Sequence, residues 1–336
     1  MGRSGRGAAA AREGGSVMRS AHLPDTATLE GRLAEALGCS SVRVIERQPN
    51  PQTSTFPSEI AKLELADRAM LHAFLKYESG GSNGSHGHRG GVPYEASVNR
   101  ILLRPLGVSV PEYYGFYADG HAGQSFLITE YMTGSLRVSK SAGSAAAMVQ
   151  AAEWLGQFHA RGEQLLGRRP VPGLQQYDRA YYLGWSRRAE QATVEASGAA
   201  EWFQAAVAGF RQSVDALLCT DASPIHGEYY PKNILVHDGR IRPIDWESAA
   251  VAAGEVDLAA LIEKWPAGTV ELCQRAYEQA RWPGGAPPDW RRRLRLAQLY
   301  LQFRWLAAGA WRRAPDPASS WRLGATRSVS ASLGFT

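Results

Sequence analysis

Residues 226–247 read HGEYYPKNILVHDGRIRPIDWE and are the most informative stretch of this chain. Two short aliphatic runs flank the pair Asp238-Gly239. This pair favours a tight type I′ turn, because both residues tolerate the positive φ that the turn requires. The stretch therefore predicts a β-hairpin, with Asn233 just before its first strand and Asp245 just after its second.

The hairpin has a chemical consequence. Antiparallel strands joined by a two-residue turn bring their outer ends together, so we expect Asn233 and Asp245 side by side. An amide oxygen and a carboxylate are hard oxygen ligands that suit Mg²⁺, which bridges the phosphates of ATP. Glu228 precedes Asn233 by five residues and supplies a second carboxylate near the same point. A carboxylate in that place can accept the proton of a substrate hydroxyl.

The rest of the chain changes character along its length. The following segments show strand or helix patterns in the first half: strands at 42–47, 60–65, 70–77 and 125–131, and helices at 28–37 and 93–106. From about residue 142 onward the hydrophobic periodicity is mostly helical. This order predicts an α+β fold of two lobes, a small β-rich N-terminal lobe and a larger, mostly helical C-terminal lobe.

Composition excludes several classes of protein. The 336 residues are 44% hydrophobic and 21% charged, which is typical of a globular protein with enough chain for two lobes. The net charge of +5 is not accompanied by a nucleic-acid motif, so we expect no nucleic-acid partner. There is no apolar run of about 18 residues, so we expect no membrane span. Three scattered cysteines without a C-x-x-C pair argue against a zinc site and fit a reducing, cytoplasmic setting.

The 226–247 stretch resembles the catalytic and metal loops of the aminoglycoside phosphotransferase and choline kinase family. The pattern of that family is H-G-D-x-x-x-x-N, a hydrophobic hairpin, and then I-D-W or I-D-F; here it stands as HGEYYPKN and IDW. The spacing is specific, and the hairpin context agrees with it. The resemblance covers roughly residues 40–310. It implies a protein-kinase-like fold that uses ATP and Mg²⁺ to phosphorylate a hydroxyl of a small molecule.

The resemblance also implies roles for residues outside this stretch. Lys76 resembles the lysine that holds the nucleotide phosphates, and Glu95 resembles the helix glutamate that pairs with it. The run LITEYM resembles the hinge between lobes, which makes Glu130 and Met132 candidates for contact with the adenine edge. Asp257 resembles the aspartate that braces the catalytic loop from a following helix.

Within the stretch itself, the resemblance implies that Asn233 and Asp245 hold magnesium and that Glu228 is the catalytic base. Lys232 either stabilises charge on the transferring phosphoryl group or points to solvent. Glu247 either touches a second metal ion or has a structural role.

The chain departs from the family pattern at two places. Glu228 stands where the family usually has Asp, and a displacement of about 1 Å can cost roughly a hundredfold in rate. The alternative reading is therefore a catalytically impaired nucleotide-binding protein of the same fold. The turn at 48–58 contains no glycine. Its Ser54 and Thr55 are candidate phosphate donors, and the alternative is an ordinary turn bounded by prolines.

Three segments complete the domain assignment. We expect residues 1–22 to be a disordered leader, although a transit peptide would have a similar composition. We expect a nucleotide-binding lobe at 23–131 and a helical lobe with catalytic loop and acceptor pocket at 132–330.

The segment 247–336 holds 8 acidic and 12 basic residues, which weakens the case for a polycationic acceptor. Within it, 290–313 predicts a helix with apolar residues inward and arginines outward.

Overall fold

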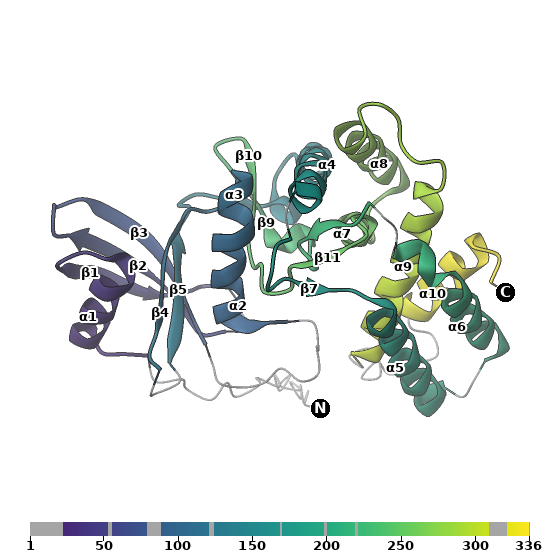
Figure 1. The fold of residues 1–336 in the computed structure, drawn as a ribbon, viewed down its shortest axis with the longest axis horizontal. Helices are drawn as coiled ribbons and strands as arrows, with labels where there is room; N and C mark the ends of the chain where they lie inside the picture. Colours follow the sequence, from purple (N-terminus) through teal and green to yellow (C-terminus); the bar gives the residue numbers. More distant parts are fainter. Residues whose placement is uncertain are drawn as a thin grey trace, which may run out of the picture.

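The computed structural model describes residues 23–52, 56–78, 89–120, 124–168, 170–197, 200–218, 221–308 and 321–335. The chain forms a lobe built on one antiparallel sheet and a second lobe built mainly of helices (Figure 1). The predicted α+β class, with strands first and helices later, is confirmed.

The N-terminal sheet has five strands in the spatial order β1-β2-β3-β5-β4, and all neighbours are antiparallel. Their bounds are β1 Val42–Pro49, β2 Ser58–Leu65, β3 Met70–Tyr77, β4 Tyr113–Ala118 and β5 Ser125–Glu130. Four of these strands match the predicted segments, whereas β4 was not predicted. Its aromatic composition is favourable for a strand, and Gly115 explains its position in the fold. A Cβ on Gly115 would lie 2.5 Å from the carbonyl oxygen of Ala36, so glycine allows α1 (Thr26–Leu37) to approach the sheet.

Successive side chains of β3 point to opposite faces of the sheet, one facing the apolar core and the other facing the cleft. Ala73 and Leu75 point to the face that α1 covers, where they join the buried residues Leu29 and Leu33. Lys76, next along the strand, therefore points to the opposite face, and its side chain lies in the cleft described below. The strand thus places a charged residue where a ligand can reach it.

A helical segment crosses that opposite face of the sheet. It consists of α2 (Gly91–Val98), a π-helical turn (Asn99–Leu103) and α3 (Arg104–Leu106), which together match the predicted helix. Val92 and Ala96 of α2 pack on Leu127 of β5. This packing holds Glu95 of α2 toward the cleft beside the sheet.

The C-terminal lobe is built from helices packed around one large apolar core. Its helices are α4 Ser144–Arg168, α5 Arg179–Ser197, α6 Glu201–Ser213, α7 Glu255–Ile262, α8 Ala267–Arg281, α9 Trp290–Ala307 and α10 Trp321–Ser332. Helix α4 packs against α8, and α9 packs against α5 and α7. Two short sheets lie where this lobe meets the first. They are β10-β9-β6 and β7-β11-β8, with β6 Leu136–Arg137, β7 Gln175–Gln176, β8 Ser223–Ile225, β9 Ile234–His237, β10 Arg240–Pro243 and β11 Ala250–Ala252.

The predicted hairpin is confirmed as β9 and β10. His237 pairs with Arg240 across the turn. Asp238 and Gly239 have φ values of 48° and 71°, as a type I′ turn requires. The hairpin therefore has the register that the sequence predicted.

The prediction that the arginines of α9 face outward is wrong for two of them. Arg293 and Arg304 are each only 4% exposed. Arg293 donates to both carboxylate oxygens of Asp221 and to Glu255, so its charge is paired inside the lobe. The contacts of Arg304 belong to the candidate active site.

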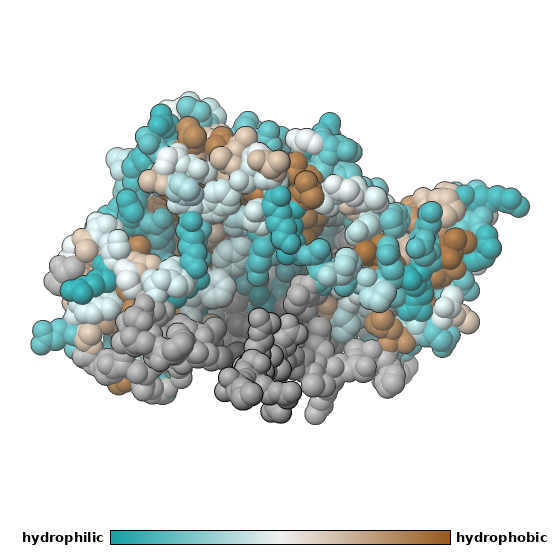
Figure 2. Space-filling view, turned by 180° about the vertical axis from the view of Figure 1, so that it is seen from behind, coloured by the Kyte–Doolittle hydropathy of each residue, from teal (hydrophilic) through white to brown (hydrophobic). Residues whose placement is uncertain are grey.

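Of the described helices, not one combines the length and apolar character that a membrane span needs. On the face shown in Figure 2, hydrophobic residues lie in small groups among hydrophilic ones. Exposed large hydrophobic side chains come from separate elements, such as Ile45 of β1, Val194 of α5 and Leu272 of α8.

Candidate active site

A cleft of about 360 Å³ lies where the sheet of the first lobe meets the β9–β10 hairpin. The residues that line it include Phe56, Lys76, Glu95, Met132, Asn233 and Asp245. Apolar walls with a few convergent polar groups are typical of a small-molecule site. The cleft thus brings together candidates that lie far apart in the sequence.

Lys76 is the centre of a charge cluster in this cleft. Its Nζ donates to Glu95 Oε2 at 2.7 Å and to Asp245 Oδ1 at 2.5 Å, and Glu247 Oε2 lies 3.7 Å away. Burial alone would lower the pKa of Lys76, but the carboxylates of Asp245 and Glu95 outweigh it and raise that pKa above its usual value. Lys76 is therefore held as a fixed cation on the wall of the cleft.

Asp245 follows the second hairpin strand in an unusual conformation. Its φ is +71°, a left-handed value that costs a non-glycine residue free energy and often marks a functional position. The next residue, Trp246, donates its backbone N–H to Glu95 Oε1 at 3.0 Å, which fixes this turn to α2. Burial opposes ionisation of Asp245, but the neighbouring ammonium of Lys76 prevails and lowers its pKa. Asp245 is therefore charged and held in place.

Asn233 ends a 3₁₀ turn, Pro231–Asn233, just before β9. Its side-chain Nδ2 donates to the backbone carbonyl of Glu228 at 3.0 Å. Its own backbone carbonyl accepts the N–H of Ile244 at 2.9 Å, which places Asp245 next to it across the hairpin. Because the amide nitrogen is used as a donor, the amide oxygen is the atom that suits a cation.

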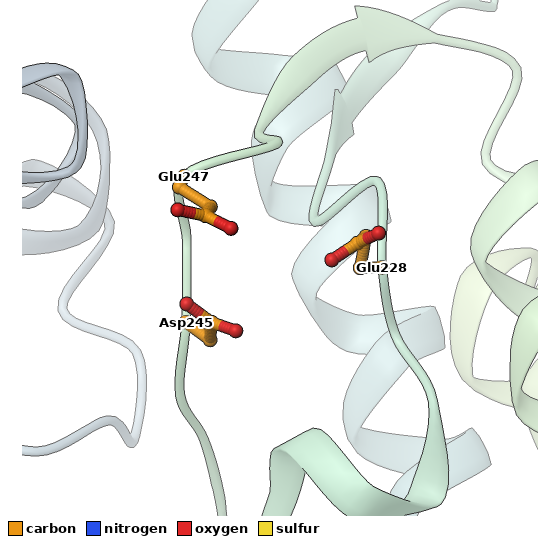
Figure 3. Close-up of side chains that lie close together, drawn as sticks. All are labelled: Glu228, Asp245 and Glu247. Carbon is orange, nitrogen blue, oxygen red and sulfur yellow. The ribbon is translucent and has the colours of Figure 1, made fainter. Parts of the chain in front are cut away.

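Three carboxylates meet at this point. Oxygens of Glu228, Asp245 and Glu247 lie within 4.8 Å of one another, and Figure 3 shows Glu228 facing the other two across a gap. Burial raises the pKa of Glu247 to about 7. Among the described residues, neither Glu247 oxygen accepts a hydrogen bond of good geometry, although Arg89 Nε lies 3.2 Å from Oε1. Carboxylates clustered in this way, with the amide oxygen of Asn233 as a further oxygen ligand, form a donor set that fits Mg²⁺.

The loop that carries Glu228 is fixed by Asp257 of α7. The carboxylate of Asp257 accepts the backbone N–H of His226 at 2.6 Å and that of Gly227 at 2.8 Å, so the predicted bracing contact is confirmed. Gly227 has a φ of +79°, and a Cβ on it would lie 2.1 Å from the carbonyl oxygen of Ser248. The loop therefore needs glycine at this position for both conformation and space.

Two arginines that were not predicted as site residues donate hydrogen bonds to the carboxylate of Glu228. Arg89 donates to both oxygens, at 3.1 and 2.9 Å, and Arg304 of α9 donates to Oε1 at 2.7 Å. A signal for Arg304 exists in the sequence. Residues 293, 297, 300 and 304 recur at helical spacing, and all four are buried, so the two arginines share the apolar face of α9. No comparable pattern marks Arg89, which follows a glycine-rich run.

The remaining predicted residues have mixed outcomes. Met132 lines the cleft and is buried, whereas the side chain of Glu130 accepts the backbone N–H of Glu112 at 3.1 Å. Lys232 is exposed at the cleft, with its Nζ 5.5 Å from the ring centre of Tyr230. Ser54 and Thr55 lie outside the described residues.

Comparison with solved structures shows the fold. Choline kinase LicA from Streptococcus pneumoniae has a TM-score of 0.60 at 15% identity, with 91% of this chain and 99% of that chain covered. A choline/ethanolamine kinase family protein from Mesorhizobium loti has a TM-score of 0.55 at 17% identity, covering 85% and 87%. A thermostable mutant of aminoglycoside phosphotransferase APH(4)-Ia has a TM-score of 0.61 at 17% identity, covering 91% and 98%. No curated protein sequence gives a significant match.

Comparison with sequence families gives a more specific result. The family described as "Phosphotransferase enzyme family" matches residues 99–296, which is more than half of the chain. The match contains the loop that carries Glu228, the hairpin and Asp245, so it covers the helical-lobe part of the site built above. The structural neighbours share the two-lobed, kinase-like architecture over nearly their whole length. This chain belongs to the phosphotransferase enzyme family.

Proposed function

We propose that this protein transfers the γ-phosphoryl group of ATP to a hydroxyl group of a small molecule, with Mg²⁺ as cofactor. The observation that carries the proposal is the position of Asp245. Its carboxylate meets Lys76 of the sheet lobe on one side and lies within 4.8 Å of Glu228 of the helical lobe on the other. A cation suited to phosphate and a carboxylate that can accept a proton thus lie on either side of Asp245, an arrangement suited to direct phosphoryl transfer.

The nucleotide is assigned to the lobe at 23–131. Lys76, oriented by Glu95, would contact the nucleotide phosphates, and the backbone near Glu130 and Met132 would contact the adenine edge. Phe56, Phe74 and Leu127 supply the apolar walls of the same cleft. Support comes from similar structures that are nucleotide complexes: LicA with AMP, and APH(4)-Ia with ADP and hygromycin B.

Asp245 and Asn233 are the residues that would hold Mg²⁺, and Glu247 is a further candidate. When bound, the ion would neutralise charge on the phosphates. The chain supplies the rest of the site: Lys76 fixes Asp245, and the hydrogen bond from Asn233 to the Glu228 carbonyl ties the metal ligands to the catalytic loop.

Glu228 is the proposed base in the lobe at 132–330. The bond between the γ-phosphorus and the β,γ-bridging oxygen breaks, and a bond from phosphorus to the substrate oxygen forms. The hydroxyl proton passes to the Glu228 carboxylate, and ADP leaves with the electron pair of the broken bond. Lys232, exposed at the mouth of the cleft, is the candidate for stabilising charge on the transferring group.

A second candidate function is nucleotide binding without turnover. It is favoured by the state of Glu228, whose carboxylate is buried and accepts hydrogen bonds from two guanidinium groups. A carboxylate whose oxygens already accept hydrogen bonds from two guanidinium groups has no free oxygen facing a substrate hydroxyl unless one of the arginines withdraws.

The test measures Mg-ATP binding and ADP formation separately, with a panel of alcohols, sugars, amino alcohols and aminoglycosides as acceptors. Wild-type protein should bind Mg-ATP and form ADP with at least one acceptor. Asp245→Asn should weaken both, and Glu228→Gln should retain binding but lose turnover. Asp238→Asn, in the exposed hairpin turn, is the matched control and should change neither. Binding without turnover across the panel would favour the second candidate, and absence of Mg-ATP binding would contradict both.

A further inference from the structure

We propose that Arg304 is a positioning residue that makes a glutamate usable at position 228, where the family pattern has an aspartate. The inference rests on the proposed function, in which Glu228 receives the hydroxyl proton. Arg304 touches neither the proposed nucleotide site nor the proposed metal ligands directly, so its effect on the reaction would pass through Glu228.

The guanidinium of Arg304 makes contacts along the catalytic loop. Nη1 donates to the carbonyl oxygen of Gly227 at 2.9 Å. Nη2 donates to Glu228 Oε1 at 2.7 Å and to the hydroxyl oxygen of Tyr230 at 3.1 Å. One planar group therefore fixes the backbone before Glu228, the side chain of Glu228 and the residue two positions later.

These contacts address the difference between glutamate and aspartate. Glutamate has one more methylene and one more side-chain torsion, so its carboxylate can occupy more positions relative to the backbone. A bond from Arg304 to Gly227 O sets the guanidinium relative to the backbone, and the bond to Oε1 then sets the carboxylate relative to the guanidinium. The rigid geometry of the guanidinium is suited to this task, whereas a lysine ammonium could make only a point contact.

Burial makes Arg304 a fixed support. Its side chain is 5% exposed, as is that of Glu228, and it comes from the interior face of α9. Arg89, the other arginine on this carboxylate, is 15% exposed and donates to both of its oxygens. Arg304 is therefore suited to stay in place while the contact of Arg89 with Oε2 gives way to a substrate.

The loop that carries Glu228 is held by two residues of opposite charge, Asp257 and Arg304. Asp257 of α7 accepts backbone N–H groups of His226 and Gly227, while Arg304 of α9 donates to the carbonyl of Gly227 and the carboxylate of Glu228. Asp257 was predicted from the family pattern. Arg304 is the additional contact, and it reaches the side chain that differs from that pattern.

The experiment compares wild type, Arg304→Met, Arg304→Lys, Glu228→Gln and the double variant Glu228→Gln/Arg304→Met. The probes are Mg-ATP binding and ADP formation from Mg-ATP, with the acceptor of the panel described above that gives wild type its highest turnover. We expect Arg304→Met to lower kcat roughly a hundredfold, as a misplacement of about 1 Å does, with KM for Mg-ATP changed less than about threefold. Arg304→Lys should recover part of kcat. In the Glu228→Gln background the same Arg304→Met change should lower kcat by less than about threefold, because the two residues act as one unit.

Arg293→Met is the matched control, because Arg293 is an equally buried, ion-paired arginine on the same helix. It should lower the Tm but leave kcat within about threefold. Equal loss of kcat in Arg293→Met, or additive effects of Arg304→Met and Glu228→Gln, would show that Arg304 is merely structural. If Arg304→Met does not fold, Arg304→Lys decides: wild-type kcat in that folded variant overturns the proposal. Wild-type protein that forms no ADP with any acceptor of the panel contradicts the proposed phosphoryl transfer and this inference together, whereas normal turnover in Arg304→Met contradicts this inference alone.

Discussion

The ammonium nitrogen of Lys76 lies 2.5 Å from a carboxylate oxygen of Asp245, although 169 residues separate them in the chain. Lys76 belongs to the sheet lobe, and Asp245 follows the hairpin of the helical lobe. The contact therefore joins the two lobes across the cleft. A second link is nearby, because the backbone N–H of Gly90 donates to the carbonyl oxygen of Glu247 at 2.8 Å. The site exists only when both lobes are in place.

We predict that Lys76→Met destabilises the protein and weakens nucleotide binding. Removal of the ammonium leaves the buried carboxylate of Glu95 without its partner, and breaking a buried ion pair in this way costs about 3–5 kcal/mol. Urea unfolding measures the free energy of unfolding, and titration with Mg-ATP measures affinity, which should fall at least roughly tenfold. Lys62→Met, at an exposed position of β2, is the control. It should change neither the free energy of unfolding nor the affinity for Mg-ATP by much. Unchanged affinity in Lys76→Met would contradict the assigned role.

A pair of glycine substitutions tests the conformation of the catalytic loop. Gly227 and Gly239 both have positive φ values, 79° and 71°, so alanine strains the backbone at each by about 1–2 kcal/mol. At Gly239 the added Cβ meets nothing within 4 Å, whereas at Gly227 it would lie 2.1 Å from a backbone carbonyl oxygen. Gly227→Ala should therefore be clearly less stable than Gly239→Ala and inactive. Equal melting temperatures for the two variants would show that the loop can move aside.

We predict that the buried His159 makes the free energy of unfolding depend on pH. Burial lowers its pKa from 6.5 to about 4, since the ring is fully enclosed between α4 and the network of Asp257, Tyr277 and Arg281. The unfolded chain then binds more protons than the native protein between these two values, so stability should fall as pH falls from about 6.5 to about 4. Over this whole pH range the free energy of unfolding should fall by about 3 kcal/mol.

Comparison of wild type with His159→Gln isolates this contribution. The glutamine variant does not titrate at position 159, so the difference in free energy of unfolding between the two proteins should shrink steadily as the pH drops from 6.5 to 4. Urea unfolding at several pH values, in the presence of EDTA, provides the measurement. Parallel stability curves for the two proteins would contradict the prediction.

We predict that replacement of Arg89 changes the Mg²⁺ concentration that the protein needs for activity. Its guanidinium lies against two of the three clustered carboxylates, 2.9 Å from Glu228 and 3.2 Å from Glu247. Loss of this positive charge should increase attraction between the cluster and a divalent cation. We expect Arg89→Met to lower the Mg²⁺ concentration for half-maximal ADP formation several-fold, with Arg104→Met, exposed on α3, as the control. A higher Mg²⁺ requirement in Arg89→Met would indicate that Arg89 contacts phosphate instead.

The strongest predictions came from local patterns. The pair Asp238-Gly239 fixes a turn whose conformation depends on its own two residues, so the hairpin and its register followed directly. The adjacency of Asn233 and Asp245 followed from that register, because an antiparallel hairpin allows no other placement of its outer ends. Lys76 and Glu95 could be named only through the family resemblance, and the structure shows them in contact at 2.7 Å.

Other features could not be read from local patterns. Helical periodicity marks one face of α9 as buried, but average tendencies place arginine outside, and so Arg293 and Arg304 were assigned to the surface. Their burial depends on partners that lie far away in the chain, Asp221 and Glu255 for one and Glu228 for the other. A buried charge is tolerated only with such partners, and periodicity along one helix does not reveal them.

By itself, the sequence determined the order of strands and helices and the hairpin, since each depends on neighbours within a turn, a strand or a helix, and the family resemblance named the residues of the site. Only the tertiary structure decided how Glu228 is held, with Arg89 approaching from the sheet lobe and Arg304 from the last long helix of the core. The physical reason is that the position of a charged side chain in a protein interior is set by the partners that compensate its desolvation, and here those partners lie 139 and 76 residues away along the chain.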